Sequence, residues 1–238
     1  EALISFARYK PLLKYKDYCI HIHHIQVINK SFYSFLKCFD LEYGLSIRGS
    51  DITIHYLYND EYRENINLAL INAKLIHTVS SDLASKVHNI TRSNNIITIP
   101  RYTSLNNSNS KKNIVKDNLF ILSVGRYHWV KGYNYILESL YRISQKNIKF
   151  KYFICGDGTD EETKHLKYLI EMYNLNDKVE LVGFVEQNKI LKYYEISNIY
   201  ICGSLYEGMP NAVINAINLH VPIVATSVGG VPEIIKNK

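Results

Sequence analysis

The sequence lacks the features of a membrane-spanning, exported or metal-binding protein. None of its apolar runs reaches the roughly 18 residues that a membrane-spanning helix needs, and its first residues do not follow the basic-then-apolar order of a signal peptide. The four cysteines (Cys19, Cys38, Cys155 and Cys202) show no metal-ligand spacing. We therefore expect a cytoplasmic protein with buried, reduced thiols.

The sequence also has no Gly-x-Gly-x-x-Gly after a predicted strand, which disfavours a dinucleotide-dependent dehydrogenase. Its composition is that of an ordinary globular protein: of its 238 residues 47% are hydrophobic and 21% are charged, enough for one or two cores. The 28 Lys and Arg exceed the 22 Asp and Glu, which gives a net charge of +6. This excess favours an anionic partner such as a phosphate, a nucleic acid or an acidic membrane surface, without choosing among them.

Apolar segments typical of strands alternate with amphipathic segments typical of helices along the chain. In the first half the predicted strands cover residues 18–23, 43–47, 75–79 and 96–99, with helices through residues 32–39, 62–72 and 80–88. In the second half the predicted strands cover residues 119–124, 150–155, 179–181, 199–202 and 223–226, with helices over residues 132–144, 161–172, 188–197 and 211–220. Such alternation predicts parallel sheets.

The composition changes between residues 103 and 118, where Ser, Asn and Lys predominate. This segment is the best candidate for an interdomain linker, and the alternation restarts after it. We therefore predict two domains, residues 1–116 and 117–238. The second should be doubly wound, with its ligand crevice at the carboxyl ends of its strands.

Two cations follow the first strand of the second half. The strand runs into GRYHWVKG at residues 125–132, which places Arg126 and Lys131 at the carboxyl edge of the sheet. Gly125 lets the backbone approach a ligand, Arg126 offers a planar fork to phosphate oxygens, and Lys131 adds a point charge. The pair could hold a diphosphate. From spacing alone, two solvated surface cations near a helix start are the simpler interpretation.

A second cluster, SLYEGMPNAVINA at residues 204–216, follows a strand and opens a helix. Gly208 permits a tight turn, Pro210 suits a first helical turn, and the free backbone amides there form an anion site. The carboxylate of Glu207 could bind sugar hydroxyls or simply complement the helix dipole. Two more glycine-bearing turns, GGVPE at residues 229–233 and CGDG at residues 155–158, end other strands of the same half.

Together these motifs resemble the donor-binding domain of glycosyltransferase family 4, whose members are retaining enzymes of the GT-B fold. The resemblance covers VGRYHWVKG (124–132), EGMPNAV (207–213), PIVAT (222–226) and GGVPE (229–233), in the family's order. The first half resembles the later part of the family's acceptor domain through HIH (21–23), RGSD (48–51) and HTVS (77–80), without the glycine-rich loop that opens that domain. The resemblance implies an α/β protein of GT-B fold, with two Rossmann-like doubly wound domains facing across a cleft and the first incomplete.

The resemblance also implies roles for residues on the donor side. Arg126 and Lys131 would bind the donor diphosphate and stabilise it as it leaves, in place of a divalent metal. The absence of any Asp-x-Asp agrees with this role. Glu207 would hold hydroxyls of the transferred sugar. The other donor-binding residues would be Gly125, Gly208, Met209, Pro210, Asn211, Asn215, Gly229 and Gly230.

Asn215 departs from the family pattern. The family places a second glutamate eight residues after the one matched by Glu207, where it accepts hydrogen bonds from the ribose hydroxyls. An amide oxygen accepts more weakly than a carboxylate, so a loss of about 1–2 kcal/mol of donor affinity is expected.

On the acceptor side, His23 matches a family histidine near the reacting carbon of the sugar, and His21 is the weaker match. Arg48, Ser50 and Asp51 would line the acceptor side. The alternatives are a histidine packed at a sheet edge, and a helix cap at Ser50 or Asp51.

We therefore predict a metal-independent retaining glycosyltransferase that moves a sugar from a UDP- or GDP-sugar to a saccharide or lipid-linked acceptor, in polysaccharide or glycolipid synthesis. It would need no cofactor beyond this co-substrate, bind no nucleic acid, and contact the inner face of an anionic membrane peripherally. The main alternative is a non-catalytic nucleotide-sugar-binding or partner subunit, motivated by Asn215 and by chain ends that look cut. A sugar-nucleotide epimerase of similar fold is a weaker one.

Overall fold

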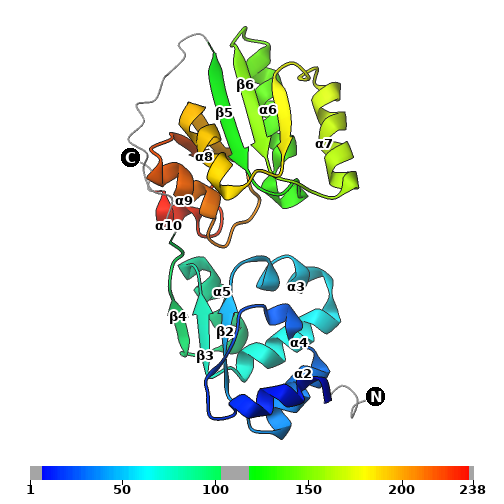
Figure 1. Ribbon diagram of the computed structural model, residues 1–238, viewed down its shortest axis with the longest axis vertical. Coiled ribbons are helices and arrows are strands. Elements are labelled where there is room, and N and C mark those ends of the chain that lie inside the picture. Colours follow the sequence, from blue (N-terminus) through cyan, green and yellow to red (C-terminus); the bar gives the residue numbers. More distant parts are fainter. Residues whose placement is uncertain (1–6, 103–117, 236–238) are drawn as a thin grey trace. The chain divides into compact units, whose positions relative to one another are not determined.

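The computed structural model describes residues 7–102 and 118–235. The chain divides into two compact units, the first formed mainly by residues up to 101 and the second mainly by residues 118–234 (Figure 1). The predicted domain boundary after residue 116 lies outside the described residues, as does the predicted linker up to residue 117.

The first unit contains a parallel sheet in the order β1-β2-β3-β4. Its strands are β1 (Ile20–Ile22), β2 (Tyr43–Ile47), β3 (Leu75–Thr78) and β4 (Ile96–Thr98), and its helices are η1 (Lys10–Tyr15), η2 (Ile25–Val27), α2 (Lys30–Cys38), η3 (Ser50–Ile52), α3 (His55–Tyr58), α4 (Asp60–Ile71) and α5 (Ser81–Thr91). Side-chain oxygens start three of these helices: Asn29 caps α2, Asn59 caps α4, and Ser80 caps α5.

Each connection in this sheet steps to the next strand in the same direction. Because such crossovers are right-handed, they place α2, α4 and α5 on one face of the sheet. Strand residues that point to that face alternate with residues that point away from it. The core on the helical side contains Ile22, Leu45, Ile47 and Ile76 from the strands and Phe35, Leu36, Ile66, Leu70, Leu83 and Val87 from the helices.

The second unit contains a parallel sheet in the order β7-β6-β5-β8-β9. Its strands are β5 (Leu119–Val124), β6 (Phe150–Cys155), β7 (Val179–Gly183), β8 (Ile199–Cys202) and β9 (Ile223–Ala225), and its helices are η4 (Trp129–Lys131), α6 (Tyr133–Ser144), α7 (Asp160–Met172), α8 (Gln187–Ile196), α9 (Asn211–Asn218) and α10 (Val231–Ile234). The chain winds outward from β5 to β7, then returns to the other side of β5.

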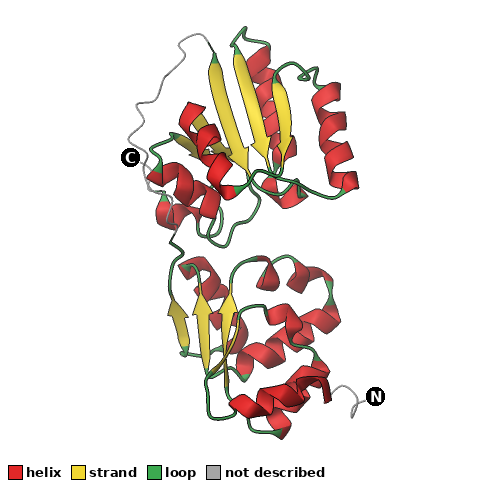
Figure 2. Ribbon diagram, in the orientation of Figure 1, coloured by secondary structure: helices red, strands yellow, loops and turns green. Residues whose placement is uncertain are grey.

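This reversal puts helices on both faces of the second sheet, with α6 and α7 on one face and α8 and α9 on the other (Figures 1 and 2). A hydrophobic core lies under α6 and α7. It is formed by buried residues of both layers, including Ile121, Leu137, Leu140, Tyr152, Ile154, Leu166 and Ile170.

The alternation predicted from the sequence is confirmed, and most element ends agree within two residues. The predicted burial of the thiols is correct for Cys155 and Cys202 but wrong for Cys19 and Cys38, which are exposed. Cys19 precedes the edge strand β1, and Cys38 is the last residue of α2, so neither lies under another layer. Within the two described stretches, no helix combines the length and apolarity needed to cross a membrane.

Candidate functional site

The second sheet has one topological switch point, where β5 and β8 lie side by side. The chain leaves β5 toward one edge of the sheet and leaves β8 toward the other, so their following loops diverge to opposite faces. Crevices formed at such points are the usual ligand sites of doubly wound folds. The loops concerned are residues 125–132 after β5 and residues 203–210 after β8.

Backbone contacts join these two loops directly. The Leu205 amide donates a hydrogen bond of 2.8 Å to the Val130 carbonyl. Gly132 has a φ of +64°, and a Cβ atom added to it would lie 2.0 Å from the Gly203 carbonyl oxygen. Only glycine fits there, both because of the left-handed backbone and because of the space.

The turn after β6 packs against the start of the β5 loop. The Tyr127 amide donates to the Asp157 carbonyl at 2.7 Å, and the Gly125 amide donates to the Cys155 carbonyl at 2.9 Å. A Cβ atom on Gly156, which has a φ of +145°, would lie 2.1 Å from the Gly125 oxygen. The loop after β5 therefore contacts both the loop after β8 and the turn after β6, so three of the four glycine-bearing strand ends predicted from the sequence lie together.

The two predicted cations lie at opposite ends of the β5 loop. Lys131 ends η4, and its side chain folds back so that a Cβ atom added to Gly125 would be 3.2 Å from Lys131 Cε. The Tyr133 hydroxyl donates to the Gly125 carbonyl at 2.9 Å and fixes the start of the loop. Arg126 is exposed. The loop therefore carries one ammonium group held at the end of β5 and one guanidinium open to solvent.

The loop after β8 leads into α9 through Glu207, Gly208 and Met209. Pro210 is the N-cap of α9, one residue earlier than the first-turn position predicted for it, and the helix begins at Asn211. The first amides of a helix have no intrahelical acceptor, so this end of α9 keeps donors for an anion.

Asn215 lies in the second turn of α9, and its amide oxygen is buried with no hydrogen-bond partner among the described residues. The Tyr194 hydroxyl gives its proton to the Ala212 carbonyl at 3.0 Å. Burial raises the pKa of Tyr194, and the neighbouring Asn215 amide opposes that rise, so Asn215 faces this phenol. A contact with ribose would require the Asn215 side chain to turn.

The predicted turn at Gly229 and Gly230 precedes the short helix α10, and Gly229 adopts a φ of +52°. The preceding Thr226 joins this turn to the β8 loop. Its hydroxyl donates to the Ser204 carbonyl at 2.5 Å, and its amide donates to the Cys202 carbonyl at 2.9 Å.

In the first unit, two predicted residues meet at the carboxyl ends of neighbouring strands. Arg48 follows β2 and donates a hydrogen bond of 3.0 Å to Nδ1 of His23, which follows β1. Because a guanidinium has no acceptor, this contact assigns the His23 proton to Nε2. Ser50 and Asp51 open η3, whose N-cap is Gly49, and neither side chain is a helix cap.

The sequence did not predict a hydrogen-bonded chain that crosses the first sheet. His21 Nε2 lies 2.8 Å from Ser46 Oγ, Ser46 Oγ lies 2.9 Å from His77 Nδ1, and His77 Nε2 lies 3.1 Å from the Ile99 carbonyl. Since a carbonyl only accepts, a neutral His77 donates from Nε2, Ser46 donates to His77, and His21 donates to Ser46. We name these three side chains the histidine–serine ladder.

Burial lowers the pKa of His21, and the nearby His23, His77 and Arg48 act in the same direction. The neutral imidazole of His21 is therefore favoured, and its Nε2 proton can be donated to Ser46. The ladder could have been suspected from the sequence, because Ser46 interrupts an apolar strand and histidines occur in the predicted strands before and after it.

Comparison with known proteins adds a family and a fold. The sequence profile of the family described as Glycosyl transferases group 1 matches residues 106–238. An uncharacterized glycosyltransferase of Methanocaldococcus jannaschii is 32% identical over 158 residues, which are 65% of this chain and 37% of that protein. The putative colanic acid biosynthesis glycosyltransferase WcaL of Escherichia coli is 30% identical over 124 residues, 50% of this chain and 30% of that protein. The chain thus spans about a third of the length of these curated relatives.

Among solved structures, that of Anabaena HepE in complex with UDP-glucose resembles this chain with a TM-score of 0.81 at 17% identity, over 96% of this chain and 65% of that one. At this identity the likeness shows the fold alone. Together with the two parallel sheets, it confirms the predicted α/β, GT-B fold class.

Proposed function

Since this chain belongs to the group 1 glycosyl transferases, we propose that it is part of a metal-independent glycosyltransferase. The enzyme would move a sugar from a UDP- or GDP-sugar to an acceptor hydroxyl with retention of configuration. The observation that carries the proposal is the pair of joined loops at the switch point between β5 and β8. These loops present Arg126, Lys131 and the first amides of α9 at one edge of one sheet.

The proposed chemistry is electrostatic. As the glycosidic bond breaks, negative charge develops on the leaving diphosphate, and Arg126 and Lys131 stabilise it. Glu207 accepts hydrogen bonds from hydroxyls of the transferred sugar. Two cations then do the work that a divalent ion does elsewhere, so no metal is required.

His23 has a different role in the proposal. Its Nδ1 is occupied by Arg48, which leaves the Nε2 proton to be donated. His23 would therefore position the sugar by donating a hydrogen bond from Nε2.

The names of the relatives support the proposed class of acceptor. WcaL is described as a colanic acid biosynthesis enzyme, which supports a saccharide or lipid-linked acceptor in polysaccharide or glycolipid synthesis. We also propose a cytoplasmic location with peripheral contact to an anionic membrane, and the net charge of +6 supports the membrane contact.

The test is to incubate the protein with a panel of UDP- and GDP-sugars and to follow nucleotide release with and without an acceptor extract, in excess EDTA. We expect release from one sugar nucleotide, stimulated by acceptor and unaffected by EDTA. Activity that disappears in EDTA and returns with Mg²⁺ or Mn²⁺ would contradict the role given to the two cations.

The second candidate is a non-catalytic nucleotide-sugar-binding or partner subunit. The buried, unpartnered amide oxygen of Asn215 favours it, because that side chain does not present a ribose acceptor as it stands. This candidate predicts saturable binding of UDP or GDP with no nucleotide release from any sugar nucleotide, with or without acceptor.

A further inference from the structure

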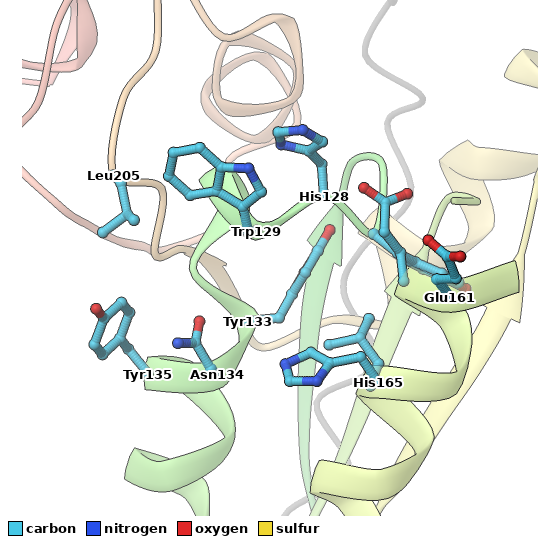
Figure 3. A pocket seen from close by; sticks show the side chains of 11 residues that line it. His128, Trp129, Tyr133, Asn134, Tyr135, Glu161, His165 and Leu205 are labelled. Atoms are coloured by element: carbon cyan, nitrogen blue, oxygen red, sulfur yellow. The ribbon is translucent and has the colours of Figure 1, made fainter. Parts of the chain in front are cut away.

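The second unit contains a pocket of about 380 Å³ beside the candidate donor site, and residues of both site loops, including Trp129 and Leu205, form part of its wall. It lies between the start of α6, the start of α7 and η4, and side chains from all three reach into it (Figure 3). Its volume lies within the range of sites that bind small molecules. Neither Arg126 nor Lys131 lines it.

One side of the pocket is aromatic. Trp129 and Tyr135 are 53% and 54% exposed, although large aromatic side chains are normally well covered. The His128 ring lies 5.5 Å from the indole, centroid to centroid. Beneath them Tyr133 is buried and held by its hydrogen bond to Gly125. The aromatic side is therefore an open surface on a rigid base.

The other side is polar and acidic. Glu161 and His165 on α7 face the start of α6 across the pocket (Figure 3). Glu162 also lines it, but one of its oxygens accepts from the Thr159 amide in the capping box of α7. Glu161 makes no hydrogen bond or ion pair with any described residue, so its carboxylate is available to a ligand.

The charge of the lining selects the ligand. The chain carries a net charge of +6, yet two carboxylates and no Lys or Arg line this pocket. A phosphate or a uronate would be repelled. An uncharged molecule with an apolar face for stacking and several hydroxyls for a carboxylate and an imidazole fits the lining, and a pyranose ring has both.

We propose that this pocket binds a neutral saccharide unit, as a second sugar site that adjoins the donor site but contains neither Arg126 nor Lys131. Identifying that unit as part of the acceptor glycan rests on the proposed function. The binding itself does not. Trp129 and Tyr135 stack on the ring, and Glu161 accepts hydrogen bonds from its hydroxyls. Bound here, a glycan would be held within the same unit as the β5 loop.

The experiment uses Trp129, the only tryptophan of the chain, as its reporter. Its fluorescence is titrated with glucose, galactose, N-acetylglucosamine and their disaccharides, on protein saturated with UDP so that the donor site is filled. Glucuronic acid and uridine serve as the anionic and base-stacking probes. We expect a saturable change with at least one neutral saccharide and none with glucuronic acid or uridine.

Variants separate this site from the donor site. Glu161→Gln and Tyr135→Ala should each weaken saccharide binding about fivefold or more and leave UDP binding unchanged. The matched controls on α7, Glu171→Gln and Tyr168→Ala, are exposed, do not line the pocket and should change neither. Arg126→Ala should weaken UDP binding only.

Three outcomes would overturn the proposal: no saturable change with any neutral saccharide, saccharide binding that Arg126→Ala abolishes, or binding that both pocket variants leave intact. Uridine binding in place of saccharide would also overturn it. Failure of the proposed function looks different, because UDP- and GDP-sugars would then show no turnover while the saccharide titration is unaffected.

Discussion

The two sheets of this protein are both parallel, but one winds in a single direction and the other reverses. In the described part of the first unit, β1 to β4 follow in order, so the crossovers leave one face without connecting helices. In the second unit the reversal at β5 covers both faces and creates a switch point. Only the second sheet therefore has a crevice dictated by its topology.

The two sheets can be compared at one equivalent position, because each has a serine as the penultimate residue of an interior strand. Ser46 in β2 joins two histidines on the face away from the helices. Ser123 in β5 accepts from the fully buried Tyr152 at 2.8 Å and donates to the Ile201 carbonyl at 2.5 Å. The same residue type bridges neighbouring strands in both sheets, but the partners of Ser46 reach solvent, whereas Tyr152, the partner of Ser123, is fully buried.

The largest expected effect comes from variants that test whether the second unit, whose sheet reverses direction at β5, carries the chemistry. Arg126→Ala and Lys131→Ala should each slow transfer by about 30- to 1000-fold, which corresponds to about 2–4 kcal/mol in the transition state. Donor affinity should fall less, because the helix amides still hold the ground-state diphosphate. Single-turnover rates and donor dissociation constants measure the two quantities. Equal losses in both would make these residues uniform binders, and no loss would make them solvated surface cations.

The next largest effect is a difference between Ser123 and Ser46 in how much protein stability is lost when each is replaced. Ser123→Ala should lower the free energy of unfolding by about 2–3 kcal/mol, because it leaves the buried Tyr152 hydroxyl without an acceptor. Ser46→Ala should cost less than about 1 kcal/mol, since His21 and His77 reach solvent. Urea unfolding of each variant supplies the numbers. The double variant Ser123→Ala/Tyr152→Phe is the control and should recover part of the loss. Equal costs for the two serines would remove the contrast.

A smaller effect is expected at α9. Asn215→Glu should tighten donor binding by roughly 1 kcal/mol, about fivefold, because a carboxylate accepts charge-assisted hydrogen bonds from ribose hydroxyls. Free UDP or GDP should show the same gain, since the contact is to the ribose. Asn215→Gln, similar in length but uncharged, should show none. If the folded Glu variant binds both ligands no better than wild type, the side chain at position 215 does not turn from Tyr194 to reach the ribose.

The smallest expected effect is a pH response confined to the first unit. The folded pKa of His21 is lowered by burial below its unfolded value of 6.5, so below that pH the unfolded chain binds the proton more readily. This contribution to stability is complete above pH 6.5 and is lost as the pH falls toward the folded pKa. Hydrogen exchange of the β1–β3 amides, corrected for intrinsic rates, should reveal it. His21→Gln should flatten the response, and an unaltered response would exclude His21 as its source.

The sequence predicted elements well and side-chain partnerships poorly. The helix start at Ser80 was predictable because a cap needs only the next three residues. The four-residue helix α3 was missed because it is too short to show a period. The histidine–serine ladder joins residues 25 and 31 positions apart, and only strand register brings them together. The aromatic pocket likewise combines α6 with α7.

The thiols give the two units different chemical reactivity. Cys19 and Cys38 in the first unit are exposed, whereas Cys155 and Cys202 in the second are buried, and burial raises the pKa of Cys155 to about 12. An alkylating dye added to the native protein will therefore mark the first unit alone. Energy transfer from Trp129 in the second unit to such a dye in the first unit would then report changes in the distance between the two units.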